Sequence, residues 1–174
     1  MNSVIRLGLF GASDILESVM CQAFIKHPNF VIVGLASKSS KKLERISRQL
    51  KCKKYSSYND LINSNSIDAA YISLPNSLHY SISKKLLNKG IHCLVEKPMT
   101  CSEIESIDIN NLAKERGIAL VETFQFQYHS QFNYIKNIIN KNILGSLRFI
   151  DIKFGFPLGK DKPNIRFQKG LKGG

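Results

Sequence analysis

The stretch His92-Cys93-Leu94-Val95-Glu96-Lys97-Pro98 decides how the rest of the chain is interpreted. Its apolar residues predict a buried strand, which ends abruptly in an acid, a base and a proline. In an open α/β sheet, ligands bind at the carboxyl ends of the strands. Glu96 and Lys97 are therefore expected at the mouth of a crevice. A random acid–base pair after a strand would be ordinary loop residues, so the interpretation depends on the surrounding sequence.

Size and composition set the limits within which this interpretation must fit. The chain has 174 residues, of which 43% are hydrophobic, enough for one full domain and part of another. No apolar run approaches the length of a membrane span, and no export signal is visible, so we expect a cytoplasmic protein. The four cysteines are scattered and have no metal-ligand spacing to a histidine, which predicts reduced thiols and no metal site.

The charge balance is strongly basic, with 25 Lys and Arg residues against 13 Asp and Glu residues. Such a protein could bind nucleic acid or an anionic surface. The excess is mostly lysine, however, and it is spread along the chain without alternating aromatic residues. We therefore expect neither a nucleic-acid partner nor a membrane partner.

The amino-terminal segment has the pattern of a dinucleotide-binding unit. A strand at 4–10 is followed by the turn Gly11-Ala12-Ser13-Asp14 and by helical spacing from Ile15 to Lys26. A phosphate at this turn would meet backbone N–H groups and the positive end of the helix dipole. Ser13 and Leu16 replace two of the three fingerprint glycines, so looser packing is expected at Leu16 and a plain β-turn-α unit remains an alternative.

The end of the second predicted strand, 30–36, indicates which cofactor is bound. NAD-binding proteins usually place an acid here to hold the ribose 2′-hydroxyl, whereas this chain has Ser37-Lys38-Ser39-Ser40-Lys41-Lys42. A hydroxyl and several ammonium groups suit a 2′-phosphate. The sequence therefore favours NADP, with NAD possible. Alternatively, Lys41 and Lys42 are the solvated start of a helix.

A strand at 67–74 runs into Pro75 and Asn76 and is expected to open on the same crevice as Gly11. Asn76 offers both a donor and an acceptor there. His79 is expected to begin a helix over 80–88, where a histidine is more often a structural cap than a catalyst. The remaining predicted helices cover 43–50, 58–62, 102–116 and 132–140, and the remaining strands cover 53–55 and 118–122.

After Gly145 the pattern changes to a strand of a different sheet, 146–156, with alternate apolar residues. The predicted fold is α/β, a Rossmann doubly wound parallel sheet followed by the beginning of an α+β open-sheet domain. The expected domains are 1–122 and 123–174. An uncovered apolar strand has unpaired edges, which predicts a homodimer or other self-association.

Together these residues resemble the glucose-fructose oxidoreductase, inositol dehydrogenase and MocA (Gfo/Idh/MocA) family. The resemblance covers residues 4 to 156, and its most specific parts are Pro-Asn-x-x-His and Glu-Lys-Pro. The matching segments, in chain order, are Gly11-Ala12-Ser13-Asp14-Ile15, Ala36-Ser37-Lys38, Leu74-Pro75-Asn76 with His79, Glu96-Lys97-Pro98, and Glu122-Thr123-Phe124 with Tyr128-His129.

The resemblance implies reversible hydride transfer between a nicotinamide and a carbinol or ketone carbon of a sugar, polyol or related cyclic alcohol. It implies that Lys97 approaches the reacting oxygen and that His129 lies near the substrate; these two are the candidate catalytic residues. The candidate cofactor-binding residues are Gly11, Ala12, Ser13, Asp14, Ile15, Ser37, Lys38, Leu74, Pro75, Asn76, His79, Glu96 and Lys97.

General chemistry supports part of this assignment independently. Reducing a ketone develops negative charge on oxygen, which a positioned ammonium such as that of Lys97 stabilises. The proton donor is not evident. In many family members it follows a Gly-Gly pair, and here Gly173-Gly174 are the last residues. Phe126 and Gln127 also replace a common Tyr-Arg pair. A catalytically incomplete nucleotide-binding fragment is therefore the alternative hypothesis.

Overall fold

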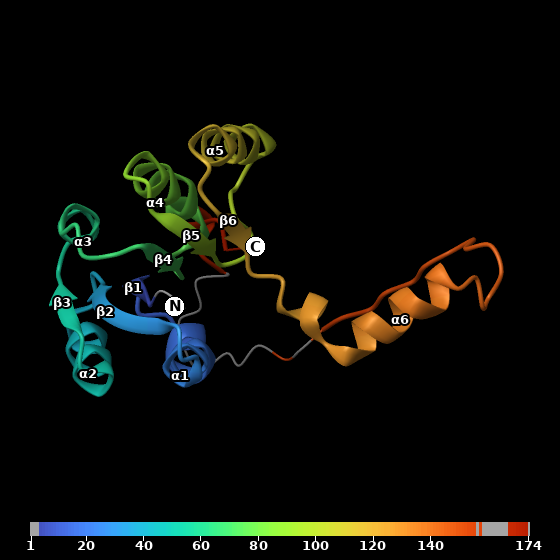
Figure 1. The fold of residues 1–174 in the computed structure, drawn as a ribbon, viewed down its shortest axis with the longest axis horizontal. Helices are drawn as coiled ribbons and strands as arrows, with labels where there is room; N and C mark the ends of the chain where they lie inside the picture. The colour runs from blue at the N-terminus through green and yellow to red at the C-terminus, as the bar shows by residue number, and fades with distance from the viewer. Residues whose placement is uncertain (1–3, 156, 158–166, 174) are drawn as a thin grey trace. The chain divides into compact units, whose positions relative to one another are not determined.

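The computed structural model describes residues 4–155, 157 and 167–173 (Figure 1). Six parallel strands form one sheet in the order β3-β2-β1-β4-β5-β6. This is the doubly wound Rossmann order, in which the chain reverses direction across the sheet between β1 and β4. The α/β fold predicted from the sequence is confirmed. The strands are β1 Ile5–Phe10, β2 Phe30–Ala36, β3 Lys53–Tyr55, β4 Ala69–Ile72, β5 His92–Val95 and β6 Leu120–Glu122.

Helices cover both faces of this sheet, with α1 and α2 on one side and α3, α4 and α5 on the other (Figure 1). The first helical segment is π-helical over Leu16–Met20 and continues directly as α1. The helices are α1 Cys21–Lys26, α2 Ser40–Leu50, α3 Tyr58–Asn63, α4 Asn76–Asn88, α5 Glu103–Arg116 and α6 Ser130–Asn140. No helix among the described residues is long and apolar enough to cross a bilayer.

The beginning of α4 differs from the sequence prediction. The pattern predicts a helix over 80–88, with His79 at its start, but α4 begins at Asn76, directly after Pro75. Proline has no backbone N–H, but N–H groups at the start of a helix have no partner within the helix. A helix can therefore begin immediately after Pro75. The polar residues Asn76 and Ser77 belong to that first turn. His79 therefore lies within the helix.

Alternation along the strands divides the core into two layers. Adjacent strand residues point to opposite faces, so Leu9 packs with the residues under α1 and α2, whereas Phe10 packs with those under α3, α4 and α5. Both side chains are fully buried. The sheet is therefore covered on both faces, as parallel sheets are.

The strand register aligns the carboxyl ends of all six strands. One row of paired residues crosses the sheet at this edge: Tyr55, Ala36, Phe10, Ile72, Val95 and Glu122. The residues that follow this row include Ser37, Gly11 and Glu96. Segments far apart in the sequence are thus brought to one edge.

The chain divides into two compact units, one through Thr123 and the other from Phe124. The first unit also includes the described residues 167–173. The second unit contains a short 3-10 helix, Gln125–Tyr128, and α6. The predicted strand 146–156 is wrong for its described part, because residues 146–155 pair with no other described strand and a strand requires a hydrogen-bonded neighbour. Phe156 lies outside the described residues.

Candidate functional site

The turn after β1 requires glycine at position 11. Gly11 has a φ of 96°, and a Cβ built on it would lie 2.7 Å from the Ser73 carbonyl oxygen. Both the backbone conformation and the space exclude a side chain. The Gly11 N–H donates to the Ala36 carbonyl, which ties the turn to β2. Because the collision is with Ser73, the residues that follow β1 and β4 approach each other closely where the sheet order reverses.

The residues after Gly11 keep backbone donors available. Among the described residues, the N–H groups of Ala12, Ser13 and Ile15 take part in no backbone hydrogen bond. The Ser13 hydroxyl oxygen accepts a hydrogen bond from the Leu16 N–H at 3.2 Å and so caps the helical segment. Leu16 is fully buried, so the residue that replaces a fingerprint glycine is part of the core. Its helical turn is π-helical, a rare geometry that is frequent at functional sites.

The turn after β2 carries the residues expected to select the cofactor. Ser37 is buried, and its hydroxyl oxygen accepts a hydrogen bond from the Ser39 N–H at 3.1 Å, which leaves the hydroxyl hydrogen able to donate. Lys38 is exposed. Lys42 forms an ion pair with Asp14 at 2.8 Å, so this lysine is matched by the acid of the glycine turn. The hydroxyl of Ser37 and the ammonium group of Lys38 thus follow β2 directly.

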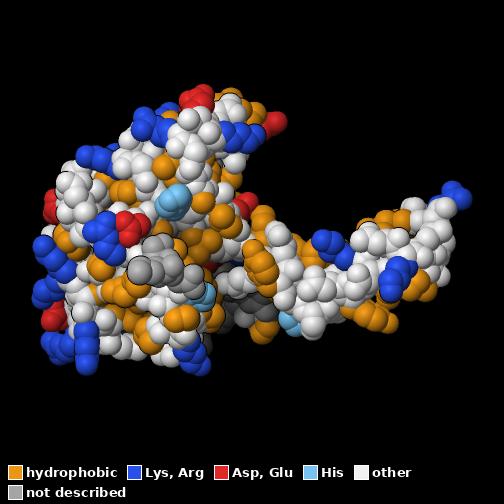
Figure 2. All heavy atoms as spheres, in the orientation of Figure 1, with side chains coloured by type: hydrophobic (Ala, Val, Ile, Leu, Met, Phe, Trp, Pro, Cys, Tyr) orange, Lys and Arg blue, Asp and Glu red, His pale blue; other side chains and the backbone are white. Residues whose placement is uncertain are grey.

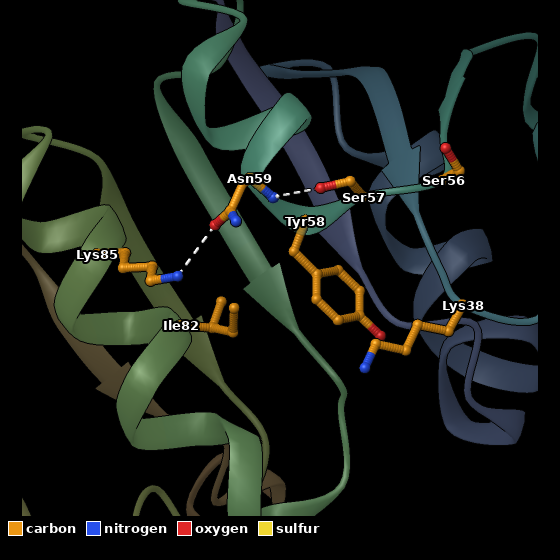
Figure 3. A pocket seen from close by; sticks show the side chains of 7 residues that line it. All are labelled: Lys38, Ser56, Ser57, Tyr58, Asn59, Ile82 and Lys85. Atoms are coloured by element: carbon orange, nitrogen blue, oxygen red, sulfur yellow. Dashed lines mark hydrogen bonds between the residues drawn. The ribbon is translucent and has the colours of Figure 1, made fainter.

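A cavity of about 300 Å³ lies beside Lys38 (Figure 3). Its wall combines the Tyr58 ring and Ile82 with polar side chains, among them Asn59 and Lys85. Burial raises the pKa of Tyr58, and the Lys38 backbone N–H donates a hydrogen bond to the phenolic oxygen, which opposes that shift. The cavity thus lies between the end of β2, the first turn of α3 and α4.

The segment after β4 presents Leu74, Pro75 and Asn76. Leu74 is buried, whereas the other two are partly exposed. The Asn76 side-chain amide donates to the Lys172 carbonyl oxygen at 2.6 Å, within the first unit. The amide nitrogen carries a second N–H, so a ligand could accept a hydrogen bond from it while this contact remains.

His79 is held between two backbone carbonyl groups. Nδ1 lies 2.7 Å from the Pro98 oxygen and Nε2 lies 2.8 Å from the Leu74 oxygen. The residue is only 1% exposed. The imidazole therefore joins the end of the β4 segment to the loop after β5. Both ring nitrogens are thus engaged by the protein, and the assignment of His79 as a cofactor-binding residue stays a prediction.

The loop after β5 is fixed by side chains from neighbouring strands. The Tyr71 hydroxyl donates to Glu96 Oε1 at 2.7 Å, and the Met99 N–H donates to Glu122 Oε1 at 2.8 Å. Burial, and then the hydrogen bond to Glu96, raise the pKa of Tyr71 far above its ordinary value. The Lys97–Pro98 peptide is cis.

Lys97 differs from the rest of this loop because its side chain is exposed. It forms no ion pair and no side-chain hydrogen bond within the described part of the chain. A fixed backbone thus presents an unpaired ammonium group. This arrangement can stabilise negative charge that develops on a bound molecule.

The second candidate catalytic residue, His129, belongs to the second unit. Its Nδ1 accepts a hydrogen bond from the Gln131 N–H at 3.2 Å, which caps α6. The imidazole is exposed. The structure brings the other site residues together within the first unit and describes His129 only within the second.

Sequence reasoning missed three residues at the site, namely Tyr71, Glu122 as a brace, and Lys85. Tyr71 is an inward-facing strand residue like its neighbours, so no sequence pattern distinguishes its hydroxyl contact. Glu122 stands at the end of a predicted strand, and this position was the available signal. Lys85 lies within a predicted helix, where a lysine usually faces solvent.

The cysteines and the potential metal ligands add no further functional group to the described site. All four cysteines are free. Burial raises the pKa of the Cys21 thiol to about 11, and burial likewise raises that of Cys52 to about 11. Such thiols are poor nucleophiles. Within the described residues, no group of three or more His, Cys, Asp and Glu side chains could hold a metal ion.

Comparisons with known proteins agree with this architecture. A family model described as an oxidoreductase family with an NAD-binding Rossmann fold matches residues 5–124. The chain is 31% identical over 170 residues to a dTDP-3,4-didehydro-2,6-dideoxy-alpha-D-glucose 3-reductase of Streptomyces violaceoruber, covering 98% of this chain and 49% of that protein. It is 32% identical over 120 residues to the D-xylose 1-dehydrogenase (NADP(+)) 2 of Haloferax volcanii, covering 69% of this chain and 37% of that protein.

A solved structure gives the same result. A variant of a 3-ketoreductase from Actinomadura kijaniata, in complex with TDP-benzene and NADP, superposes with a TM-score of 0.78 at 27% identity. The match covers 84% of this chain and 45% of that chain. The chain thus spans about half the length of the relatives it matches. The family match, together with the Rossmann topology and the glycine turn, shows that the chain belongs to the Gfo/Idh/MocA oxidoreductase family with its NAD-binding Rossmann fold.

Proposed function

We propose that this chain forms the cofactor-binding part of an NADP-dependent oxidoreductase. The reaction would transfer a hydride between the nicotinamide and a carbinol or ketone carbon of a sugar, polyol or related cyclic alcohol. Relatives described as sugar reductases and dehydrogenases support this function over a nucleotide-binding protein without turnover.

The observation that carries the proposal is the turn at Gly11. A side chain at this position would collide with the Ser73 carbonyl, and the following N–H groups of Ala12 and Ser13 have no partner among the described residues. Backbone donors at the start of a helical segment suit a pyrophosphate. The residues present therefore fit a dinucleotide at this edge of the sheet.

Ser37 and Lys38 support NADP over NAD. Neither they nor Ser39 is acidic, so no carboxylate directly after β2 would repel a 2′-phosphate. The Ser37 hydroxyl hydrogen and the Lys38 ammonium are the donors that such a group needs. The two relatives whose names or structures mention NADP agree with this preference.

Lys97 is the residue we propose at the reacting oxygen. When bound, a reduced nicotinamide supplies the hydride that adds to a carbonyl carbon. The exposed ammonium of Lys97 would stabilise the negative charge that develops on the oxygen. Glu96, held by Tyr71, and Asn76 would line the nicotinamide-ribose side. The loop that carries Lys97 is anchored through His79 and Glu122, so the ammonium is presented from a fixed backbone.

The second unit is proposed as the beginning of a substrate domain, with His129 near the substrate. Its exposed apolar residues include Phe149, Ile152 and Phe154, and apolar side chains are visible along this unit in Figure 2. We infer self-association through this region, which sedimentation velocity would detect.

The free cysteines support a reducing compartment such as the cytoplasm. On the face shown in Figure 2, basic side chains are dispersed among acidic ones.

A binding titration of NADPH and NADH against the purified chain tests the proposal, with Lys38→Ala measured alongside. We expect NADPH to bind more tightly than NADH, and the substitution to weaken NADPH binding by about tenfold while leaving NADH binding unchanged. Lys51→Ala removes an exposed charge outside the cavity and serves as the control. If neither cofactor bound, the proposal would be wrong.

A further inference from the structure

The cavity beside Lys38 contains a second lysine that the proposed function does not use. Lys85 comes from α4, whereas Lys38 follows β2, and the two side chains reach the cavity from different sides (Figure 3). The Tyr58 ring and Ile82 lie between them. The cavity volume of about 300 Å³ is at the lower end of ligand pockets, which run from roughly 300 to 1,000 Å³. It has room for part of a ligand.

Neither of these two lysines is neutralised by an acid. Several nearby lysines are: Lys42 pairs with Asp14, Lys54 with Glu44, and Lys84 with Asp108. Within the described residues, Lys38 and Lys85 have no carboxylate partner. Two uncompensated positive charges at one cavity favour a ligand that carries two negative charges.

Lys85 is also held in position. Its ammonium donates to Asn59 Oδ1 at 3.0 Å, and the Asn59 backbone N–H donates to the Ser57 hydroxyl oxygen at 3.2 Å (Figure 3). An ammonium has three N–H donors, so two remain for a ligand. Asn59 is a neutral partner, and it therefore orients the lysine without cancelling its charge.

We propose that Lys85 is a second recognition residue for the 2′-phosphate of the cofactor, acting with Lys38. The inference rests on the proposed function. A phosphate monoester carries a charge of about −1.5 to −2 at neutral pH, which one ammonium cannot balance. The tyrosine ring and Ile82 give the same cavity an apolar surface for the attached adenosine.

The experiment measures dissociation constants by calorimetry for NADPH, NADH, 2′,5′-ADP and inorganic phosphate. The variants are Lys85→Gln, Lys38→Ala and the double variant. Lys89→Gln, at the end of the same helix and outside the cavity, is the matched control for loss of one charge. Circular dichroism and a denaturant melt check that each variant is folded.

We expect Lys85→Gln to weaken NADPH and 2′,5′-ADP by about tenfold and to leave NADH unchanged. The double variant should lose most of the preference for NADPH, and Lys89→Gln should behave as the unmodified chain. Equal weakening of NADPH and NADH, or no change, would overturn the assignment of Lys85. Phosphate binding that depends on Lys85 without any effect on NADPH would overturn it too, since the cavity would then bind an unrelated anion.

The failure of this inference differs from the failure of the proposed function. If the unmodified chain bound neither dinucleotide, the function itself would be wrong. If it bound NADPH and discriminated through Lys38 alone, the function would stand and only the role of Lys85 would fall.

Discussion

The two sides of the candidate site, at the carboxyl ends of β2 and β5, are built in opposite ways. On the side of β2, the lysines that line the cavity are exposed and have no acidic partner among the described residues. On the side of β5, the loop is anchored at Glu96, Pro98 and Met99 by contacts with other elements. The β2 side can therefore recognise a charged group, whereas the β5 side holds its backbone fixed and presents one ammonium group from a defined position.

The largest effect is expected where the two sides meet, at Gly11. Gly11→Ala would place a Cβ 2.7 Å from the Ser73 carbonyl oxygen at a φ of 96°. We expect a loss of about 3–4 kcal/mol in the free energy of unfolding, because strain and collision add. Urea denaturation followed by circular dichroism measures it.

Gly117→Ala is the matched control for that substitution. Gly117 also has a positive φ, 64°, but nothing lies within 4 Å of its built Cβ. Only the left-handed backbone is strained there, which costs about 1 kcal/mol. Equal losses for the two variants would show that the close approach of β1 and β4 is unimportant.

An intermediate effect is expected at His79, on the anchored side. His79→Ala would leave the Pro98 and Leu74 carbonyl groups without this partner inside the fold. The loss of unfolding free energy should be about 2–3 kcal/mol, and we expect NADPH binding to weaken as the loop loosens. His79→Gln can retain one of the two contacts and should lose less. A chain as stable as the unmodified protein after His79→Ala would contradict the anchoring role.

The smallest effect on stability is expected at Lys97. Because its side chain is exposed and forms no ion pair or side-chain hydrogen bond within the described residues, Lys97→Ala should change the unfolding free energy by less than about 0.5 kcal/mol. Ketone reduction by the protein should nevertheless fall by at least about a hundredfold. A large loss of stability would show that the Lys97 side chain helps to anchor the loop and is not merely presented by it.

The fold was predictable to a greater extent than the site. All six strands of the sheet were predicted, most of them because buried parallel strands are runs of apolar residues, as in Phe30–Ala36. The start of α4 was missed because Asn76 and Ser77 also suit a turn. Contacts such as those of Tyr71 and Lys85 depend on side chains brought together from distant segments, and local patterns do not encode them.

The second unit shows a different limit. Alternating apolar residues over 146–155 match a strand, yet a strand is defined by its partner and none of the described segments provides one. Alternation gives the tendency of a segment, whereas pairing depends on the rest of the fold. The domain boundary near residue 122 and the role of His129 stay predictions.

Tyr71 restricts the substitutions that this protein can accept at one position of its core. Its ring packs edge-on against Phe24 in the core beneath α1, with centroids 5.2 Å apart, while its hydroxyl holds Glu96. Position 71 must therefore meet two independent requirements: an apolar side chain that fills the core, and a hydroxyl placed to reach Glu96. Phenylalanine meets only the first, and serine meets neither, because its hydroxyl lies on Cβ and cannot reach Glu96. Few substitutions are open at position 71, and a residue that looks like ordinary core is constrained as tightly as the site itself.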